Sequence, residues 1–433
     1  MPRRSVGSQA VSGGEISTRP IGTWVAAGLS LAVIGVATQF GRFAVFAALL
    51  LAPMVYVFSR LRGHAPQART TSDLVGAVLG ERFGVFAGLI QLVAYMLLAA
   101  KFARLFAMSM RGTFLAVQAN VPSGWFVFGA IAAPVAAGVL IYQLSTRGLA
   151  WVAAILAALG MLVHFYLALA LVGMIAKGDE PRNPYTPEPA PPYMAYWLIA
   201  VLLFVGFEVV TTVNRDVRSV GRSMGLALAL SAGCALTVEA AASHGLWSSI
   251  RMPYDWQFSS LAFAYLDQAG INWLLVANLA FSYAGLLTLT LAAVRVARRL
   301  AQQLELPLQY GALLAAVVAI VGVLVIVEWV WRGVASNVGD VGPLLLLAVY
   351  ACAAHAYARI PDAGPTLVAA AVRLFIWVVV AAVIVVPLRG PGPPATWVSR
   401  LVITAVVLLA ALAIAAKTDR LPLTSQPREE LRE

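Results

Sequence analysis

The sequence predicts an all-α integral membrane protein of about twelve transmembrane helices, arranged as a 5+5 inverted repeat followed by two C-terminal helices. Hydrophobic residues occupy 61% of the 433 positions, charged residues occupy only 11%, and the apolar residues gather in long runs. A soluble domain carries roughly a quarter charged residues. A chain of this composition cannot cover its surface with polar groups, so we expect its solvent to be the lipid bilayer.

The apolar runs define the predicted spans, because a helix of about 20 residues crosses the hydrocarbon core. Phe43–Phe58 is the shortest of them and follows the first span closely. In chain order the spans are Ile21–Phe40, Phe43–Phe58, Phe83–Met108, Trp125–Tyr142, Leu149–Ile175, Tyr196–Val213, Met224–Ser243, Ile271–Val296, Gly311–Trp331, Val341–Tyr357, Thr366–Leu388 and Trp397–Ala416. Before the third span, Thr71-Ser72-Asp73 offers helix N-caps for a short interfacial helix over Leu74–Gly80.

The connections between the spans predict the orientation. With the N-terminus in the cytoplasm, 19 of the 30 Lys and Arg residues fall on the cytoplasmic side, 8 fall outside and 3 lie within runs. Cytoplasmic loops carry the excess of Lys and Arg, so both termini are predicted to be cytoplasmic. Arginine accounts for 27 of the 30, which fits a GC-rich bacterial genome and hence a bacterial inner membrane. The net charge of +11 therefore needs no nucleic-acid partner.

The spans also divide the chain. A proline-rich external loop, residues 176–195, separates five spans in residues 21–175 from five in residues 196–358. An odd number of spans in each half makes the second half enter from the opposite side, as in an inverted repeat. The remaining parts are a cytoplasmic tail (1–20), the two additional helices (366–416) and a second tail (417–433).

The stretch Phe204–Met224 carries polar groups inside an apolar run. Gly206, Glu208 and two threonines precede three arginines there. Ionisable groups at membrane depth are costly and usually face a cavity or a partner, so this helix is predicted to line a pathway.

This stretch resembles the exit of the sixth helix in the amino acid–polyamine–organocation permeases. Further similarity lies before the third span and after the eighth. Arg215 replaces the first acidic residue of the family's pattern, and Val220 and Gly225 stand where the family has prolines. The matching segments are Gly206-Phe207-Glu208, Asp216-Val217-Arg218, Arg222-Ser223-Met224, Ala77–Gly88 and Ala293–Pro307.

The resemblance implies that helices 1 and 6 are broken near the midplane and that their freed backbone groups bind the substrate. It puts the breaks near Gly28–Ser30 and near Phe204–Gly206. The alternative is that these glycines only allow close helix packing. The implied substrate-binding residues are Gly28, Ser30, Phe204, Gly206 and Glu208.

Four residues are candidates for ion coupling. Glu208 could exchange a proton or hold an ammonium group, or it could instead pair with Lys101 or Arg104. The resemblance puts His164 at or beside a position where some sodium-independent members carry a lysine, and an imidazole titrates near neutral pH. A hydrogen bond to a neighbouring helix is the alternative for His164.

Thr288 and Thr290 could offer oxygens to sodium, or they could bond their own helix carbonyls. Protons are the preferred coupling ion.

The resemblance implies a secondary active transporter that moves a small amino acid or related amine by alternating access. Its expected partners are that substrate, protons and the bilayer. Cys234 and Cys352 lie without metal-ligand spacing, and no cofactor, metal or enzyme activity is expected. Two alternatives remain: a degenerate permease fold acting as a sensor or assembly subunit, and a membrane-embedded transferase acting on a lipid-linked substrate with Asp179-Glu180 as a metal-binding pair.

Overall fold

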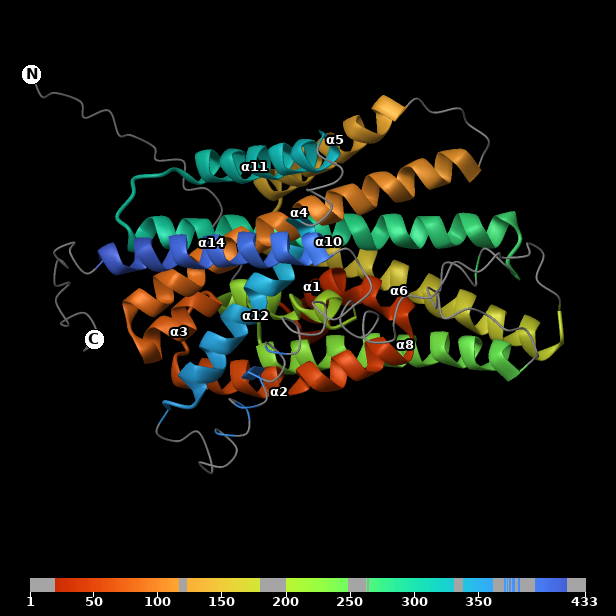
Figure 1. Cartoon of the computed structure of the whole chain (residues 1–433), viewed down its shortest axis with the longest axis horizontal. Helices are drawn as coiled ribbons and strands as arrows, with labels where there is room; N and C mark the ends of the chain where they lie inside the picture. The colour runs from red at the N-terminus through yellow and green to blue at the C-terminus, as the bar shows by residue number, and fades with distance from the viewer. Residues whose placement is uncertain are drawn as a thin grey trace, which may run out of the picture.

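The computed structural model describes residues 20–116, 123–179, 200–247, 265–330, 338–360 and 394–418, and single positions between 262 and 381. Across these residues the chain is helical (Figure 1), and the β-type pairing found there is an isolated parallel bridge between Ile21 and Val217. Most of the predicted span Thr366–Leu388 and most of the proline-rich loop fall outside them.

The helices follow the apolar runs. Within the described part of the chain, nine helical segments are long and apolar enough to cross a membrane, and Ala200–Val213 and Val341–Tyr357 are shorter apolar ones. The protein is therefore a multi-pass, all-α membrane protein. The helices are α1 (Thr23–Ile34), η1 (Gly35–Phe40), α2 (Arg42–His64), α3 (Thr71–Leu79), α4 (Glu81–Ala116), α5 (Ser123–Gln143), α6 (Thr146–Ala176), η2 (Phe207–Asp216), α8 (Val220–Trp247), α10 (Gln268–Gln303), α11 (Tyr310–Val330), α12 (Val338–Tyr357) and α14 (Pro394–Thr418).

Two helices extend well beyond their predicted spans. α4 and α10 each contain 36 residues, which at 1.5 Å per residue is about 54 Å, against a hydrocarbon core of about 30 Å. The end of α10 continues through Arg298, Arg299 and Gln303, because Arg and Gln are good helix formers in water. The predicted cap of the short interfacial helix was shifted by one residue: Thr70 is the N-cap of α3, and its side chain accepts from the Asp73 backbone N–H.

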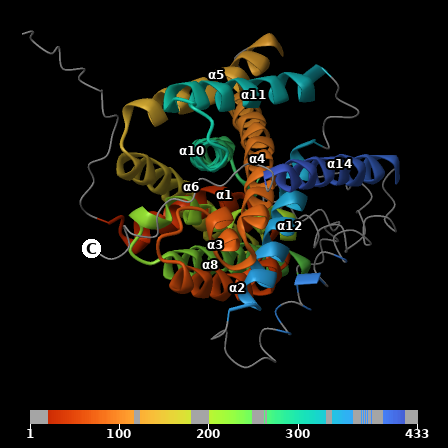
Figure 2. The same ribbon diagram turned by 90° about the vertical axis from the view of Figure 1, so that its left-hand side faces the viewer.

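Helix α10 runs through the middle of the bundle. It packs along α4, α6 and α1, and also against α5 and α11, and Figure 2 shows it end-on with these helices around it. Helix α1 lies in the core as well, since every residue from Val25 to Ile34 is buried. Helix α14 packs on α4 and α12 at the edge of the bundle (Figure 2), with most of its apolar surface uncovered, as lipid contact requires.

Candidate functional site

The sixth span is broken at Gly206. The chain is α-helical over residues 200–204 and continues beyond the break as the 3₁₀ helix η2. Gly206 has φ +113°, and a Cβ built there would lie 2.8 Å from a Val33 methyl group. Only glycine adopts this backbone conformation readily, and only glycine fits the space. The break predicted near Phe204–Gly206 is confirmed, and Phe204 is its last α-helical residue, fully buried.

The first span is not broken where we predicted. Helix α1 is regular through Gly28 and Ser30, and its winding changes to 3₁₀ only at Gly35. Gly28 lies directly against Ala154 of α6, so its small size serves helix packing. Gly35 lies directly against the Phe281 ring of α10, which leaves no room for a side chain at the point where the winding changes.

A buried carboxylate follows the break in the sixth span. Glu208 has no exposed surface. The Tyr95 hydroxyl donates to its Oε1 at 2.9 Å, and the Tyr350 hydroxyl donates to its Oε2. The alternative that Glu208 pairs with Lys101 or Arg104 is not what the structure shows: its side-chain partners are the two tyrosines, which come from α4 and α12.

Each tyrosine oxygen also accepts a hydrogen bond. The Gln91 amide donates to the Tyr95 hydroxyl at 2.8 Å, and the Gly206 backbone N–H donates to the Tyr350 hydroxyl at 3.0 Å. Since a phenol has one proton, these two donors direct both hydroxyl protons toward Glu208. A proton on Glu208 would leave lone pairs for both tyrosine bonds, but it would remove the negative charge that strengthens them.

The backbone groups freed by the break already have partners. The Gly206 N–H bonds Tyr350, and the Phe207 carbonyl accepts from the Ser30 hydroxyl at 2.6 Å. Ser30, Gly206 and Glu208 thus meet at one place, where the first and sixth spans adjoin. Gly28 lies elsewhere, against α6. We call the set Ser30, Tyr95, Gly206, Glu208 and Tyr350 the break site.

Sequence reasoning missed the two tyrosines. Tyrosine is uncharged and largely apolar, so it does not stand out in a hydrophobic run. Gln91 and Tyr95, four residues apart on one face of α4, were the available signal, because a polar pair at that spacing inside a span points to a shared partner.

His164 lies on α6 and has no exposed surface. Its ring packs at 5.2 Å from the Phe281 ring and lies within interaction range of the Asn278 side chain on α10. Asn278 in turn accepts from the Gln39 amide at 2.8 Å. His164 therefore lies at the contact between α6 and α10, against the Phe281 ring, and not in the break site.

The two threonines of α10 differ. The Thr290 hydroxyl donates to the Leu286 carbonyl at 2.8 Å, which matches the structural alternative. The Thr288 hydroxyl is buried, and no hydrogen-bond partner for it occurs within the described ranges.

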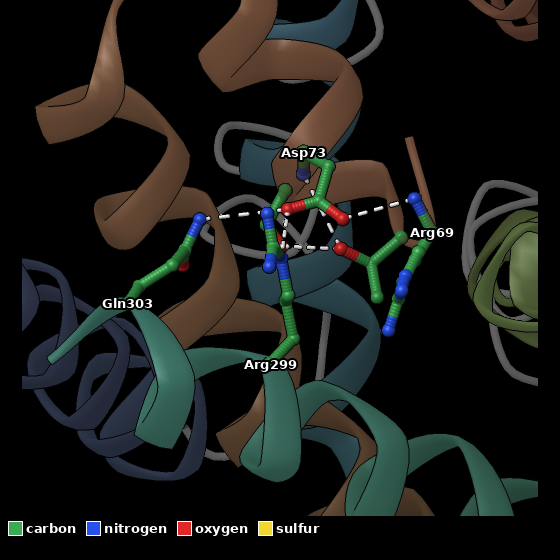
Figure 3. Close-up of polar contacts among 6 residues, drawn as sticks. Arg69, Asp73, Arg299 and Gln303 are labelled. Carbon is green, nitrogen blue, oxygen red and sulfur yellow. Dashed lines mark hydrogen bonds and ion pairs between the residues drawn. The ribbon is translucent and has the colours of Figure 1, made fainter. Parts of the chain in front are cut away.

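One end of the bundle carries a group of arginine–carboxylate contacts, drawn in part in Figure 3. The Asp73 carboxylate of α3 accepts from Arg299 Nε at 2.7 Å, from the Gln303 amide at 3.4 Å and from the Arg69 backbone N–H at 2.9 Å. One turn earlier on α10, Arg295 pairs with Asp216 at 3.0 Å. We call this the arginine-rich end.

Arg295 also fixes the far end of the broken helix. It donates to the Thr212 carbonyl at 3.3 Å and to the Thr146 hydroxyl of α6. Midway along η2, the hydroxyls of Thr71 and Thr211 lie 2.6 Å apart, which ties η2 to α3. The segment after Gly206 is therefore attached to α4 and α12 at one end and to α10, α6 and α3 farther on.

No model of a known protein family matches this chain, and no curated protein matches it. The class that the fold and the site define is a multi-pass helical membrane protein with a broken helix next to a buried carboxylate. In the part of the chain that the structure describes, no group of three or more His, Cys, Asp or Glu side chains could hold a metal ion. Of the predicted Asp179-Glu180 pair, Glu180 lies outside the described residues.

Proposed function

We propose that this protein is a secondary active transporter that moves a small amino acid or related amine across a bacterial inner membrane by alternating access. The observation that carries the proposal is the break at Gly206 beside the fully buried Glu208. Discontinuous helices with polar groups at membrane depth are the usual construction of transporter sites. Twelve spans in a 5+5 inverted repeat plus two, with both termini cytoplasmic, complete the proposed architecture.

Proton coupling through Glu208 fits the contacts of the break site. Taking up a proton would weaken both tyrosine bonds of Glu208, because a neutral carboxyl group is a poorer acceptor than a carboxylate. Loss of the Tyr350 bond would also loosen the acceptor of the Gly206 N–H. A substrate carboxylate could then take that N–H. Protonation and substrate binding would thus act on the same hydrogen bonds.

The test is uptake by purified protein in liposomes. Pooled radiolabelled neutral amino acids, and then amines, are offered with an inward proton gradient, an inward sodium gradient, or neither. We expect uptake that the proton gradient stimulates. Absence of flux for every pool under both gradients, from protein shown to be folded, would contradict the transporter proposal.

Variants show which residue the proton gradient acts through. Glu208→Gln should abolish stimulation by the proton gradient, whereas Glu239→Gln, which removes a carboxylate paired with Arg42 at 3.6 Å, should leave it intact. His164→Ala tests the second candidate. Full gradient stimulation in His164→Ala would remove His164 from the coupling path and leave Glu208 in it.

A sensor or assembly subunit is the second candidate, and one observation favours it. Both backbone groups freed at the break are already hydrogen-bonded, by Tyr350 and Ser30, so a substrate has to displace one of them. If ligands shift the melting temperature of the protein but no flux occurs, the sensor is the better proposal.

A further inference from the structure

A polar pocket lies at the arginine-rich end, away from the break site. Its volume is about 450 Å³, and it is lined by Thr23, Arg218, Ser219 and Arg222. All four side chains can donate hydrogen bonds and none is acidic. A pocket of this kind suits a polyatomic anion.

Within the described part of the chain, no carboxylate pairs with the two arginines of the pocket. The ion pairs found among the described residues are Arg42–Glu239, Arg295–Asp216 and Arg299–Asp73. Arg218 and Arg222 take part in none of these, although acids are available to the arginines nearby. An incoming anion would meet two guanidinium groups that do not already bind a carboxylate.

The backbone around the pocket increases its preference for an anion. Helix α1 begins at Thr23 without a side-chain cap on its first N–H groups. Helix α8 begins at Val220, directly after Ser219, and its first turn holds Arg222 and no acid. A cation in the first turn opposes the helix dipole, so Arg222 does not stabilise α8 by its charge. A bound anion would complement both helix starts and both arginines.

The two walls of the pocket are joined by backbone hydrogen bonds. The Ile21 N–H donates to the Asp216 carbonyl at 2.6 Å, and the Arg218 N–H donates to the Ile21 carbonyl at 3.2 Å. Arg62 Nη2 braces the same segment through the Val217 carbonyl at 3.0 Å. Its Nη1 is buried, with no hydrogen-bond partner among the residues that the structure describes. The pocket is therefore held in shape by contacts that involve none of its four lining side chains.

Trp24, which follows the pocket residue Thr23, indicates how a ligand reaches the pocket. Trp24 is 71% exposed, although the rest of α1 after it is buried. Exposed tryptophans at the ends of spanning helices lie at the level of lipid headgroups. A pocket beside Trp24 is open both to headgroup phosphates and to phosphate in solution.

We propose that Thr23, Arg218, Ser219 and Arg222 form a binding site for one phosphate group, supplied by an anionic lipid headgroup or by soluble phosphate. Arginine recognises phosphate through paired hydrogen bonds, and the two hydroxyls would complete its coordination. The site joins the start of α1, the exit of η2 and the start of α8. It is independent of the proposed transport activity.

The experiment uses the full-length protein after delipidation in a neutral detergent. Native mass spectrometry counts the molecules retained when phosphatidylglycerol, phosphatidylcholine or inorganic phosphate is added, with sulfate at equal ionic strength as a control. We expect one molecule per chain, held by wild type and weakened about tenfold in Arg218→Gln and Arg222→Gln, because a charge-assisted hydrogen bond is worth about one decade in affinity.

Arg147→Gln is the matched control. Arg147 also lies in the first turn of a helix, α6, and is exposed, but it does not line the pocket. Retention of phosphatidylglycerol over phosphatidylcholine identifies the lipid as the source, and retention of inorganic phosphate over sulfate identifies the soluble ion. If neither binds, or if Arg147→Gln loses binding as much as Arg222→Gln does, the proposal is wrong.

A second measurement needs no variant. Phenylglyoxal modifies accessible arginines, and peptide mass spectrometry reports the extent at each one. The ligand that binds should slow modification of Arg218 and Arg222 in the wild-type protein and leave Arg147 unchanged. Equal modification of all three arginines with and without either phosphate source would overturn the assignment, whatever the variants do.

Discussion

The break site and the arginine-rich end each hold a buried carboxylate, but with different partners. Glu208, fully buried at the break, is bound by two neutral hydroxyls. Asp73 and Asp216 are bound by Arg299 and Arg295, whose side chains keep 35% and 25% of their surface exposed. Full burial of an arginine carries a large desolvation penalty, whereas a partly exposed arginine keeps much of its hydration. Asp73 is 7% exposed and Asp216 is 42% exposed, so the two regions differ in the exposure of the donor more than in the depth of the carboxylate.

The difference in donors also gives the arginine-rich end and the break site different mechanical roles. Arg295 and Arg299 lie four residues apart, on one face of α10, and attach this helix to η2 and to α3. These ion pairs hold elements together while both partners stay charged. The tyrosine bonds to Glu208 depend on its protonation state. We therefore expect the arginine-rich end to act as a latch and the break site to act as a switch.

Among the substitutions that test this difference, replacement of Gly206 should reduce the stability of the protein most. Gly206→Ala forces a side chain into φ +113° and against Val33, so it should lower the free energy of unfolding by about 3 kcal/mol. Gly233→Ala makes the same chemical change on α8, where a Cβ would meet nothing within 4 Å. It should be neutral or stabilising by less than about 1 kcal/mol. Thermal unfolding in detergent measures both, and equal melting temperatures would contradict the assigned role of Gly206.

Removing one hydroxyl tests the break site alone. Tyr350→Phe deletes a donor to Glu208 and the acceptor of the Gly206 N–H, so we expect a loss of about 2 kcal/mol. Tyr283→Phe is the control. The Tyr283 ring packs on Phe106, and Tyr283 is not part of the break site. A Tyr350→Phe loss no larger than that of Tyr283→Phe would mean that the tyrosine–carboxylate contact contributes little.

The latch should be weaker and sensitive to salt. Arg299→Gln removes the ion pair with Asp73, in which only the arginine is partly exposed, and we expect a loss of about 1 kcal/mol at low ionic strength that shrinks in concentrated salt. Arg298→Gln, next on the helix and lying over the Tyr310 ring, controls for the change of charge. The effect of Tyr350→Phe should not depend on salt. If both effects respond to salt alike, the distinction between the two regions fails.

The fold followed from the sequence because lipid leaves the backbone few choices. An apolar run of 20 residues must form a helix to satisfy its own hydrogen bonds, so each predicted span that the structure describes contains one. The ends of α4 and α10 were missed because hydropathy stops at the membrane surface, whereas helix propensity continues into water.

The site was only half predictable. Gly206 and Glu208 were identified because a glycine and a carboxylate are anomalous in lipid. Their partners Tyr95 and Tyr350 lie 113 and 142 residues from Glu208, and nothing local connects them. The first break was misplaced because Gly28 and Gly35 look alike in sequence. Their different neighbours, Ala154 and Phe281, exist only in the folded bundle.

The smallest expected effect concerns Thr288, whose buried hydroxyl has no hydrogen-bond partner in the described part of the structure. Thr288→Val keeps the shape and removes the unsatisfied group, so stability should stay the same or rise by less than about 1 kcal/mol. Thr290→Val removes a bond to the Leu286 carbonyl and should cost about 0.5 kcal/mol.

A measurement in sodium distinguishes the two roles considered for Thr288, a ligand of a sodium ion and a purely structural residue. A sodium ion bound by this hydroxyl would raise the melting temperature of wild type in sodium relative to potassium, and Thr288→Val would abolish the rise. We expect no such rise, because the proposed proton coupling through Glu208 needs no sodium site. A sodium-dependent shift that disappears in Thr288→Val and persists in Thr290→Val would make α10 a part of the switch. The latch on α10 and the switch at the break site would then not be separate regions.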